Sequence, residues 1–127
     1  MSKKNLIKCY AKSTFEQINE EIFGNRLPKM RIIIKRKIKR KETFALYWKN
    51  KCWIFRDELK NCGEFLPHQV FAIVAHETIH HAQNFHKINK LNGFRNFSHN
   101  GAFFRHYARI MQNKYGHKIE AMQVRYE

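Results

Sequence analysis

The feature that most constrains this chain is an uninterrupted apolar stretch that runs into two histidines and a glutamate. Residues 70–75 are all apolar, and they lead directly into the segment His76-Glu77-Thr78-Ile79-His80. An apolar run of this kind favours a buried helix over a solvated loop. On a helix, residues four apart leave the same face, so the rings of His76 and His80 would lie side by side. The sequence therefore predicts a buried helix that carries a pair of histidines on one face.

This HExxH spacing indicates metal chemistry. Two neutral imidazoles on one helical face can hold a single zinc ion. Glu77 would lie beside that metal, where its carboxylate can accept a proton from the attacking water. In an ordinary core helix the same three polar side chains would be desolvated without compensation, which is costly. We therefore expect His76 and His80 to be metal ligands and Glu77 to be a general base.

Catalytic zinc usually takes three protein ligands, so a third residue is needed. Residues 78–119 contain no carboxylate, which leaves histidine as the ligand type. The histidines that follow the motif are His81, His86, His99, His106 and His117. His86 stands where the longer metzincin pattern HExxHxxGxxH has its last histidine, but position 83 is Gln83 and not the glycine that turns the chain.

His99 is the favoured third ligand, and His86 is the alternative. Ser98 can cap a helix at this point, and the apolar residues that follow recur at helical spacing, among them Phe103, Tyr107 and Met111. A histidine in the first turn of that helix can face the HExxH helix.

Other patterns predict a first helix, three strands and a last helix. The capping-box spacing of Ser13 and Glu16 predicts a helix start, and Gly24-Asn25 predicts its end. The expected strands are residues 30–38, 44–48 and 52–55, and the last two form a hairpin. Alternation demands one buried face, so we expect the hairpin aromatics to lie in the core rather than on a stacking surface. Helices grouped around a small sheet make an α+β fold.

Length and composition predict one domain over residues 1–127, because no Pro/Gly/Ser-rich linker divides the chain. The N-terminus has no apolar segment of signal-peptide length, and no apolar run approaches a membrane span. Cys9, Cys52 and Cys62 form no CxxC pair, so we expect thiols and not a disulfide framework. We expect a soluble monomer of the cytoplasm, nucleoid or nucleus, with no membrane partner and no secretion.

Charge is the second strong signal in the sequence. Lys and Arg number 25 against 10 Asp and Glu, which gives a net charge of +15. Six of the seven residues from 35 to 41 are basic: Lys35, Arg36, Lys37, Lys39, Arg40 and Lys41. A basic surface of this density attracts the phosphates of nucleic acid. No motif for reading bases is present, so we expect this run to bind DNA without sequence preference. The alternative is a solvated strand edge that lysines protect from aggregation.

The order of these elements resembles the SprT-like zinc metallopeptidases, which include the Spartan proteases. The matching features are the HExxH helix, the loop after it, the histidine that opens a further helix, the segment Thr14–Phe23 with its exit at Leu27-Pro28, and Tyr115-Gly116. The resemblance covers roughly residues 10–118. This chain differs in having Asn100 before Gly101, where the family usually has glycine directly after the third histidine, and in lacking the downstream zinc ribbon of many members.

The resemblance implies a small zincin-like α+β domain in which one Zn²⁺ is held by His76, His80 and His99. It also implies a zinc metalloendopeptidase that cleaves DNA-associated or DNA-crosslinked proteins, with Glu77 as the base. Composition by itself supports only the nucleic-acid part of this interpretation. Two alternatives stay open. One is a basic nucleic-acid-binding module with a structural or vestigial zinc site, and the other is a peptidase whose charge serves solubility or an acidic protein partner.

Overall fold

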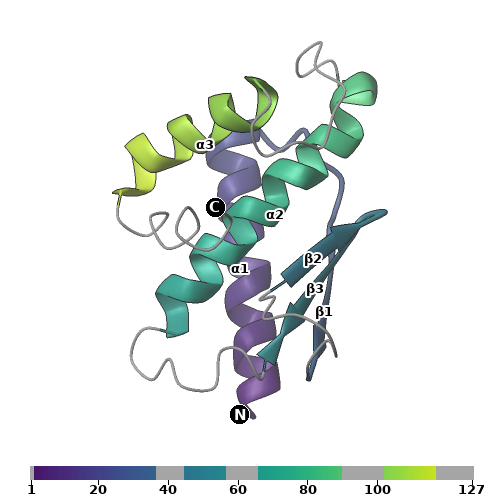
Figure 1. The fold of residues 1–127 in the computed structure, drawn as a ribbon, viewed down its shortest axis with the longest axis vertical. Helices are drawn as coiled ribbons and strands as arrows, with labels where there is room; N and C mark the ends of the chain where they lie inside the picture. The colour runs from purple at the N-terminus through teal and green to yellow at the C-terminus, as the bar shows by residue number, and fades with distance from the viewer. Residues whose placement is uncertain (1, 37–44, 57–65, 90–101, 117–127) are drawn as a thin grey trace.

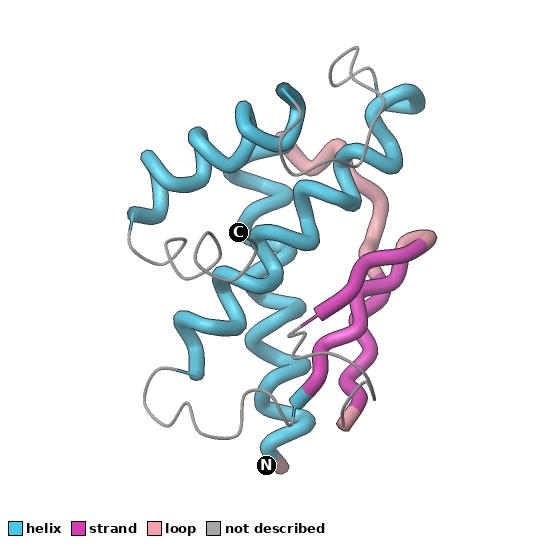
Figure 2. Tube along the Cα trace, viewed as in Figure 1, coloured by secondary structure: helices cyan, strands magenta, loops and turns pink. Residues whose placement is uncertain are grey.

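The computed structural model describes residues 2–36, 45–56, 66–89 and 102–116. Over these ranges the chain forms three helices and a three-stranded sheet, which is the predicted α+β arrangement (Figure 1). Helices α1 (Lys3–Phe23) and α2 (Leu66–Asn89) pack against each other and cover one face of the sheet. Helix α3 (Ala102–Tyr115) lies against α2 on the side away from the sheet, as the trace in Figure 2 also shows.

Helix α1 begins well before Ser13, so the prediction of its start was wrong. Ser2 is the cap, and its hydroxyl accepts a hydrogen bond from a backbone N–H of the first turn. Ile7 and Ala11 are buried, and they extend the apolar face of the helix towards the N-terminus. The helix ends where predicted, at Gly24, whose left-handed backbone (φ 58°) forms the C-cap.

The sheet consists of β1 (Arg31–Lys35), β2 (Ala45–Trp48) and β3 (Lys51–Phe55). Its strand order is β1-β3-β2, with β1 parallel and β2 antiparallel to β3. The predicted hairpin is therefore confirmed. Its turn residues Lys49 and Asn50 both have positive φ, 45° and 71°, as a tight two-residue hairpin turn requires.

The two faces of the sheet have different environments. The inner face is buried against the helices by Ile32, Ile34, Ala45, Cys52 and Ile54. On β2, strand alternation turns Tyr47 towards the helices and Trp48 towards solvent. Trp48 is 64% exposed, so the expectation that the hairpin aromatics belong to the core was wrong for this residue.

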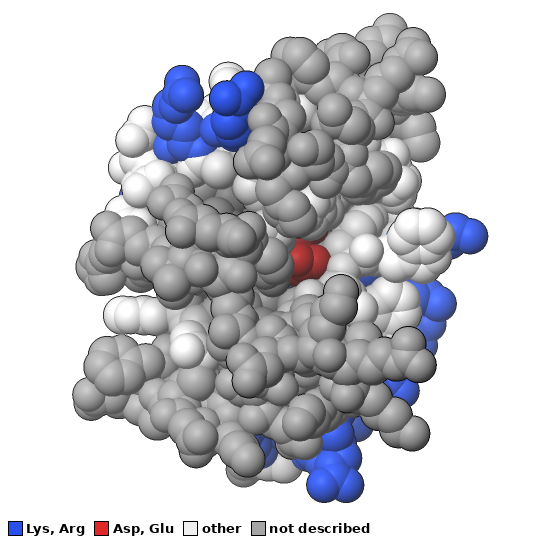
Figure 3. All heavy atoms as spheres, viewed as in Figure 1, with Lys and Arg blue, Asp and Glu red and all other residues white. Residues whose placement is uncertain are grey.

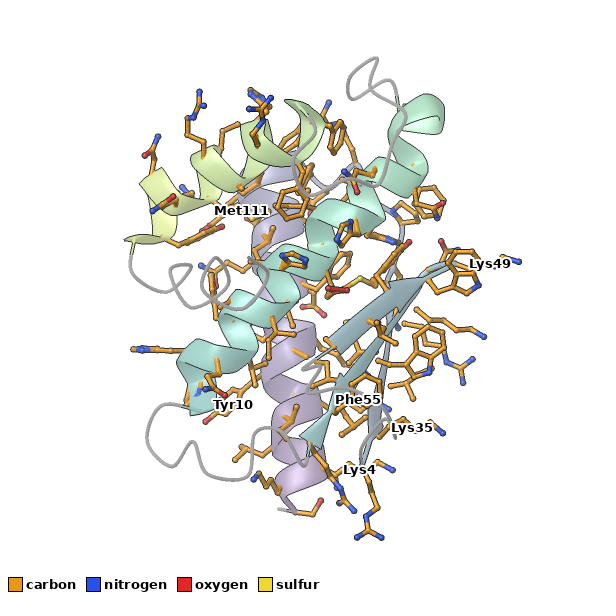
Figure 4. All side chains as sticks on the ribbon, in the orientation of Figure 1. Lys4, Tyr10, Lys35, Lys49, Phe55 and Met111 are labelled. Atoms are coloured by element: carbon orange, nitrogen blue, oxygen red, sulfur yellow. The ribbon has the colours of Figure 1, made fainter. Side chains whose placement is uncertain are left out.

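Helix α2 is the centre of the molecule. Every side chain from Val70 to Gln83 is buried, which agrees with the predicted buried helix. Helix α3 contributes Phe103, Tyr107 and Met111 to the same core, and Figure 4 shows Met111 pointing from α3 towards the other helices. None of the described helices has the sustained hydropathy that crossing a bilayer requires.

Candidate metal centre

The three residues of the predicted motif come together on one face of α2. His76 is 1% exposed, Glu77 is 3% exposed and His80 is 9% exposed. One possible ligand atom from each residue lies within 4.8 Å of the other two, so this buried group can hold a metal ion. The Nε2 atom of His76 lies 3.8 Å from Oε1 of Glu77. The helical spacing therefore produces the clustering that the sequence predicted.

Gln83 fixes the orientation of the His80 ring. Nδ1 of His80 lies 2.7 Å from Oε1 of Gln83, and because that oxygen can only accept, Nδ1 carries the proton. In this neutral tautomer Nε2 bears the lone pair that a metal would accept. A metal-binding histidine commonly has its other ring nitrogen held in this way, which sets the tautomer and the direction of the ring.

The carboxyl group of Glu77 lies in a site that favours a nearby cation. Burial raises its pKa from 4.5 to about 8, because desolvation disfavours the ionised form. Its Oε2 atom is buried and has no hydrogen-bond partner among the residues that the structure describes. A dication held by the two histidines would supply the missing counter-charge and lower this pKa. The residues present therefore fit a bound divalent metal.

The first turn of α3 lies against the histidine pair. The ring of Phe104 has its centre 4.9 Å from that of His76 and 5.3 Å from that of His80. This contact places a buried apolar side chain beside the site. His99, the predicted third ligand, lies outside the described residues, and in sequence it precedes α3 by only a few positions.

His81, which immediately follows His80, belongs to a different environment. Its Nε2 lies 2.6 Å from the carbonyl oxygen of Pro28 and therefore donates to it. Its Nδ1 then accepts the hydroxyl proton of Tyr47 at 2.7 Å. Burial lowers the pKa of His81, with a smaller opposing effect from the Pro28 hydrogen bond, so the ring stays neutral. Both ring nitrogens are thus occupied by protein groups, and His81 is not a candidate ligand.

The Tyr47 hydroxyl links α2 to the hairpin turn. It accepts hydrogen bonds from the backbone N–H of Asn50 at 3.1 Å and from Nδ2 of Asn84 at 3.2 Å. Asn84 also donates to Oδ1 of Asn50 at 3.1 Å. The position of Pro28 is set in turn by the side chain of Asn19, which bonds both backbone groups of Leu27. These contacts make His81 a structural connector between α2 and the sheet.

The structure does not place the other candidate ligand and DNA-binding residues at the site. Some are exposed elsewhere, and the others lie outside the described residues. His106 is exposed on α3, with its ring against Tyr107. The side chain of His86 and the whole of His117 lie outside the described part of the chain. Lys35 and Arg36 are exposed at the end of β1, and the rest of the basic run, Lys37, Lys39, Arg40 and Lys41, lies outside it too.

Two residues of the site were missed by sequence reasoning. Gln83 stands three positions after His80, so helical spacing could have identified it as a partner. Phe104 had no such signal, because its contact with the histidines depends on how α3 packs.

Comparison of the chain with protein-family models, curated proteins and solved structures finds no match.

Proposed function

We propose that this protein is a zinc-dependent metallopeptidase. The observation that carries the proposal is the buried cluster of His76, Glu77 and His80, with one ligand atom from each within 4.8 Å of the others. Imidazole nitrogens favour zinc and similar transition metals, whereas calcium and magnesium prefer oxygen ligands. The Gln83 hydrogen bond adds to this, because it holds His80 in the tautomer that a metal requires.

His99 is our proposed third ligand. Support comes from Phe104, which brings the start of α3 against the rings of both other histidines. His99 precedes Ala102 by three residues in sequence, and a segment of that length spans at most about 10 Å. With three histidines, one coordination position would remain for water or substrate, as in other catalytic zinc sites.

Each described side chain has a role in the proposed reaction. When bound, zinc would act as a Lewis acid on the scissile carbonyl and would acidify the attacking water. Glu77 would accept the proton of that water on a carboxylate oxygen and return it to the leaving amine. Burial raises the pKa of this carboxyl, and a bound dication would lower it again, so the metal would favour the carboxylate form that accepts the proton. Phe104 would limit access of bulk water to the site, and Gln83 would keep His80 in place.

We further propose that the chain is a SprT-like, zincin-like peptidase that acts on DNA-associated or DNA-crosslinked proteins. Its net charge of +15 and the exposed side chains of Lys35 and Arg36 support attraction to DNA. The same charge supports a second candidate, a nucleic-acid-binding module whose metal has only a structural role. Activity separates the two candidates, because only the peptidase needs Glu77 as a base.

The test is the Glu77→Gln variant. Glutamine has nearly the same shape but cannot accept the proton, so zinc content and fold should persist while hydrolysis falls by about 100-fold or more. Cleavage of a basic DNA-bound protein is followed on gels, with and without DNA, after both preparations are matched for zinc. Glu16→Gln is the matched control, because Glu16 is exposed on α1 and undergoes the same chemical change.

Two results would count against the peptidase. Equal turnover of wild type and Glu77→Gln at equal zinc content would remove Glu77 as the base. A zinc-loaded wild type with no activity on any protein substrate, in the presence or absence of DNA, would favour the binding module.

A further inference from the structure

The sheet presents an apolar surface on the side away from the helices. We call this surface the outer sheet face; it consists of Ile33, Leu46, Trp48 and Trp53. Leu46 is 43% exposed and Trp48 is 64% exposed, and the other large hydrophobic side chains that the structure describes are buried or half-buried. Ile33 and Trp53 are half-buried. Exposed aromatic area of this kind, grouped on one surface, indicates a binding site for another molecule.

Strand register makes the outer sheet face continuous. Ile33 of β1 pairs with Trp53 of β3, and Trp53 pairs with Leu46 of β2, so these three side chains form a row across all three strands. In the neighbouring row, Arg31 pairs with Lys51, which pairs with Trp48. An apolar row therefore lies directly beside a row that combines two cations with an exposed indole.

The charge around the outer sheet face is entirely positive over the described strands. Arg31 and Lys35 are exposed on β1, Lys51 is half-buried on β3, and the described residues of the three strands include no Asp or Glu. Nζ of Lys49 lies 5.5 Å from the centre of the Trp48 ring. Figure 4 shows Lys35 and Lys49 pointing outward from the sheet, and Figure 3 shows Lys and Arg side chains along the sheet side of the molecule.

The hairpin that carries Trp48 is held rigidly. Its turn residue Asn50 donates its backbone N–H to the Tyr47 hydroxyl, accepts from Asn84 of α2 through its side chain, and accepts from the Arg31 backbone N–H at 2.8 Å. The indole is therefore presented on a fixed support, which lowers the entropy lost when a ligand binds.

We propose that the outer sheet face binds single-stranded nucleic acid. One base would stack on Trp48, and backbone phosphates would contact Arg31, Lys49 and Lys51. Aromatic side chains beside cations bind single strands in this way, because every unpaired base offers a flat π surface and each nucleotide carries a phosphate. Bases in a duplex are already stacked on their neighbours, so Trp48 adds affinity for the single strand only. The site does not depend on the metal centre, because α2 lies on the inner face of the sheet.

Tryptophan fluorescence tests the stacking directly. The chain has two tryptophans, so Trp53→Phe leaves Trp48 as the only one. A single-stranded oligothymidylate should quench its emission, whereas a duplex of equal length at equal occupancy should leave it nearly unchanged. Absence of quenching under saturating single strand would overturn the proposal.

Affinity measurements give the second test. Trp48→Ala should weaken single-strand binding by about 5- to 100-fold and leave duplex affinity unchanged, while Trp48→Phe should keep most of the affinity. Because Trp48 is 64% exposed, the alanine variant should fold, which a thermal melt verifies. If Trp48→Ala binds the single strand as tightly as wild type, or loses single-strand and duplex binding equally, Trp48 is not a stacking platform.

The phosphate contacts are tested with a charge-matched pair of variants. Removing two phosphate contacts with Arg31→Gln and Lys51→Gln together should lower the slope of log affinity against log salt by about 1.4. Arg105→Gln and Lys114→Gln remove the same two charge types from exposed positions on α3, and this control should keep the wild-type slope. Equal slopes for the two double variants would place the phosphates elsewhere and contradict the proposed surface.

Discussion

Two adjacent histidines on α2 make different contacts. His80 has its Nδ1 held by Gln83, a neighbour on the same helix, and its ring lies beside His76. His81, one position later, points to the other side of α2, where Pro28 and Tyr47 occupy both of its ring nitrogens. Both rings are buried in the same helix, yet only His80 belongs to the group that could hold a metal ion.

The two histidines are alike in residue type and burial and differ in their hydrogen bonds. A ring that gives one proton to a protein acceptor keeps a lone pair on the other nitrogen. A ring whose second nitrogen also accepts a hydrogen bond is a structural link. On this helix the first arrangement occurs on the face that carries Glu77 and the second on the face that meets the sheet.

The largest expected effects come from replacing the proposed ligands. His76→Ala and His99→Ala should each weaken zinc binding by more than about 100-fold, because each removes a direct ligand. His86→Ala should keep its zinc. Zinc content by elemental analysis, followed by competition with a chromogenic chelator, measures the change.

If His86 is the third ligand instead of His99, the two alanine variants should show the opposite pattern of zinc binding. Loss of zinc in His86→Ala together with its retention in His99→Ala would exclude His99, and with it the SprT-like assignment.

Replacing His81 should affect stability and spare the metal. His81→Ala leaves a cavity and removes a partner from both Pro28 and Tyr47, so the free energy of unfolding should fall by about 2–4 kcal/mol. Urea denaturation measures this loss. His106→Ala is the control, because His106 is exposed on α3 and its removal should cost less than about 0.5 kcal/mol. Similar stabilities for the two variants would show that the His81 link contributes little.

The grouping of residues on the face of α2 that carries Glu77 was predicted from the sequence, because it depends only on local helical spacing. His76, Glu77 and His80 are clustered by helical periodicity alone, so their grouping could be read before the structure was known. The His81 side depends on contacts between distant segments, since Pro28 and Tyr47 are far from His81 in the chain. No local pattern specifies such contacts, so the role of His81 as a link between α2 and the sheet could not be predicted.

The same distinction applies to the fold. The hairpin of β2 and β3 was predicted because its signals are adjacent in sequence, whereas the parallel pairing of β1 with β3 was not. The start of α1 was misplaced because Ser13 fits a capping pattern, although burial of Ile7 and Ala11 continues the helix before it. Exposure of Trp48 follows from strand alternation, but the sequence alone did not show which face of the strand the helices cover.

Replacing Gln83 should have a smaller effect on zinc binding, because Gln83 contacts the proposed ligand His80 and not the metal. Gln83→Ala should weaken zinc binding by about 10- to 100-fold, because His80 loses the contact that fixes its tautomer and direction. Chelator competition gives the affinity, and circular dichroism shows whether the helices persist. Gln17→Ala on the exposed side of α1 should leave zinc affinity unchanged. Wild-type affinity in Gln83→Ala would mean that packing alone orients His80.

The most direct test of the proposed difference between His80 and His81 compares zinc binding by His80→Ala and His81→Ala under identical conditions. The two variants differ only in which of two adjacent histidines is removed, and both are titrated at a temperature where each is folded. We expect His80→Ala to lose more than about 100-fold in zinc affinity and His81→Ala to stay within about threefold of wild type. Retention of zinc by His80→Ala, or its loss from folded His81→Ala, would contradict the proposed metal centre.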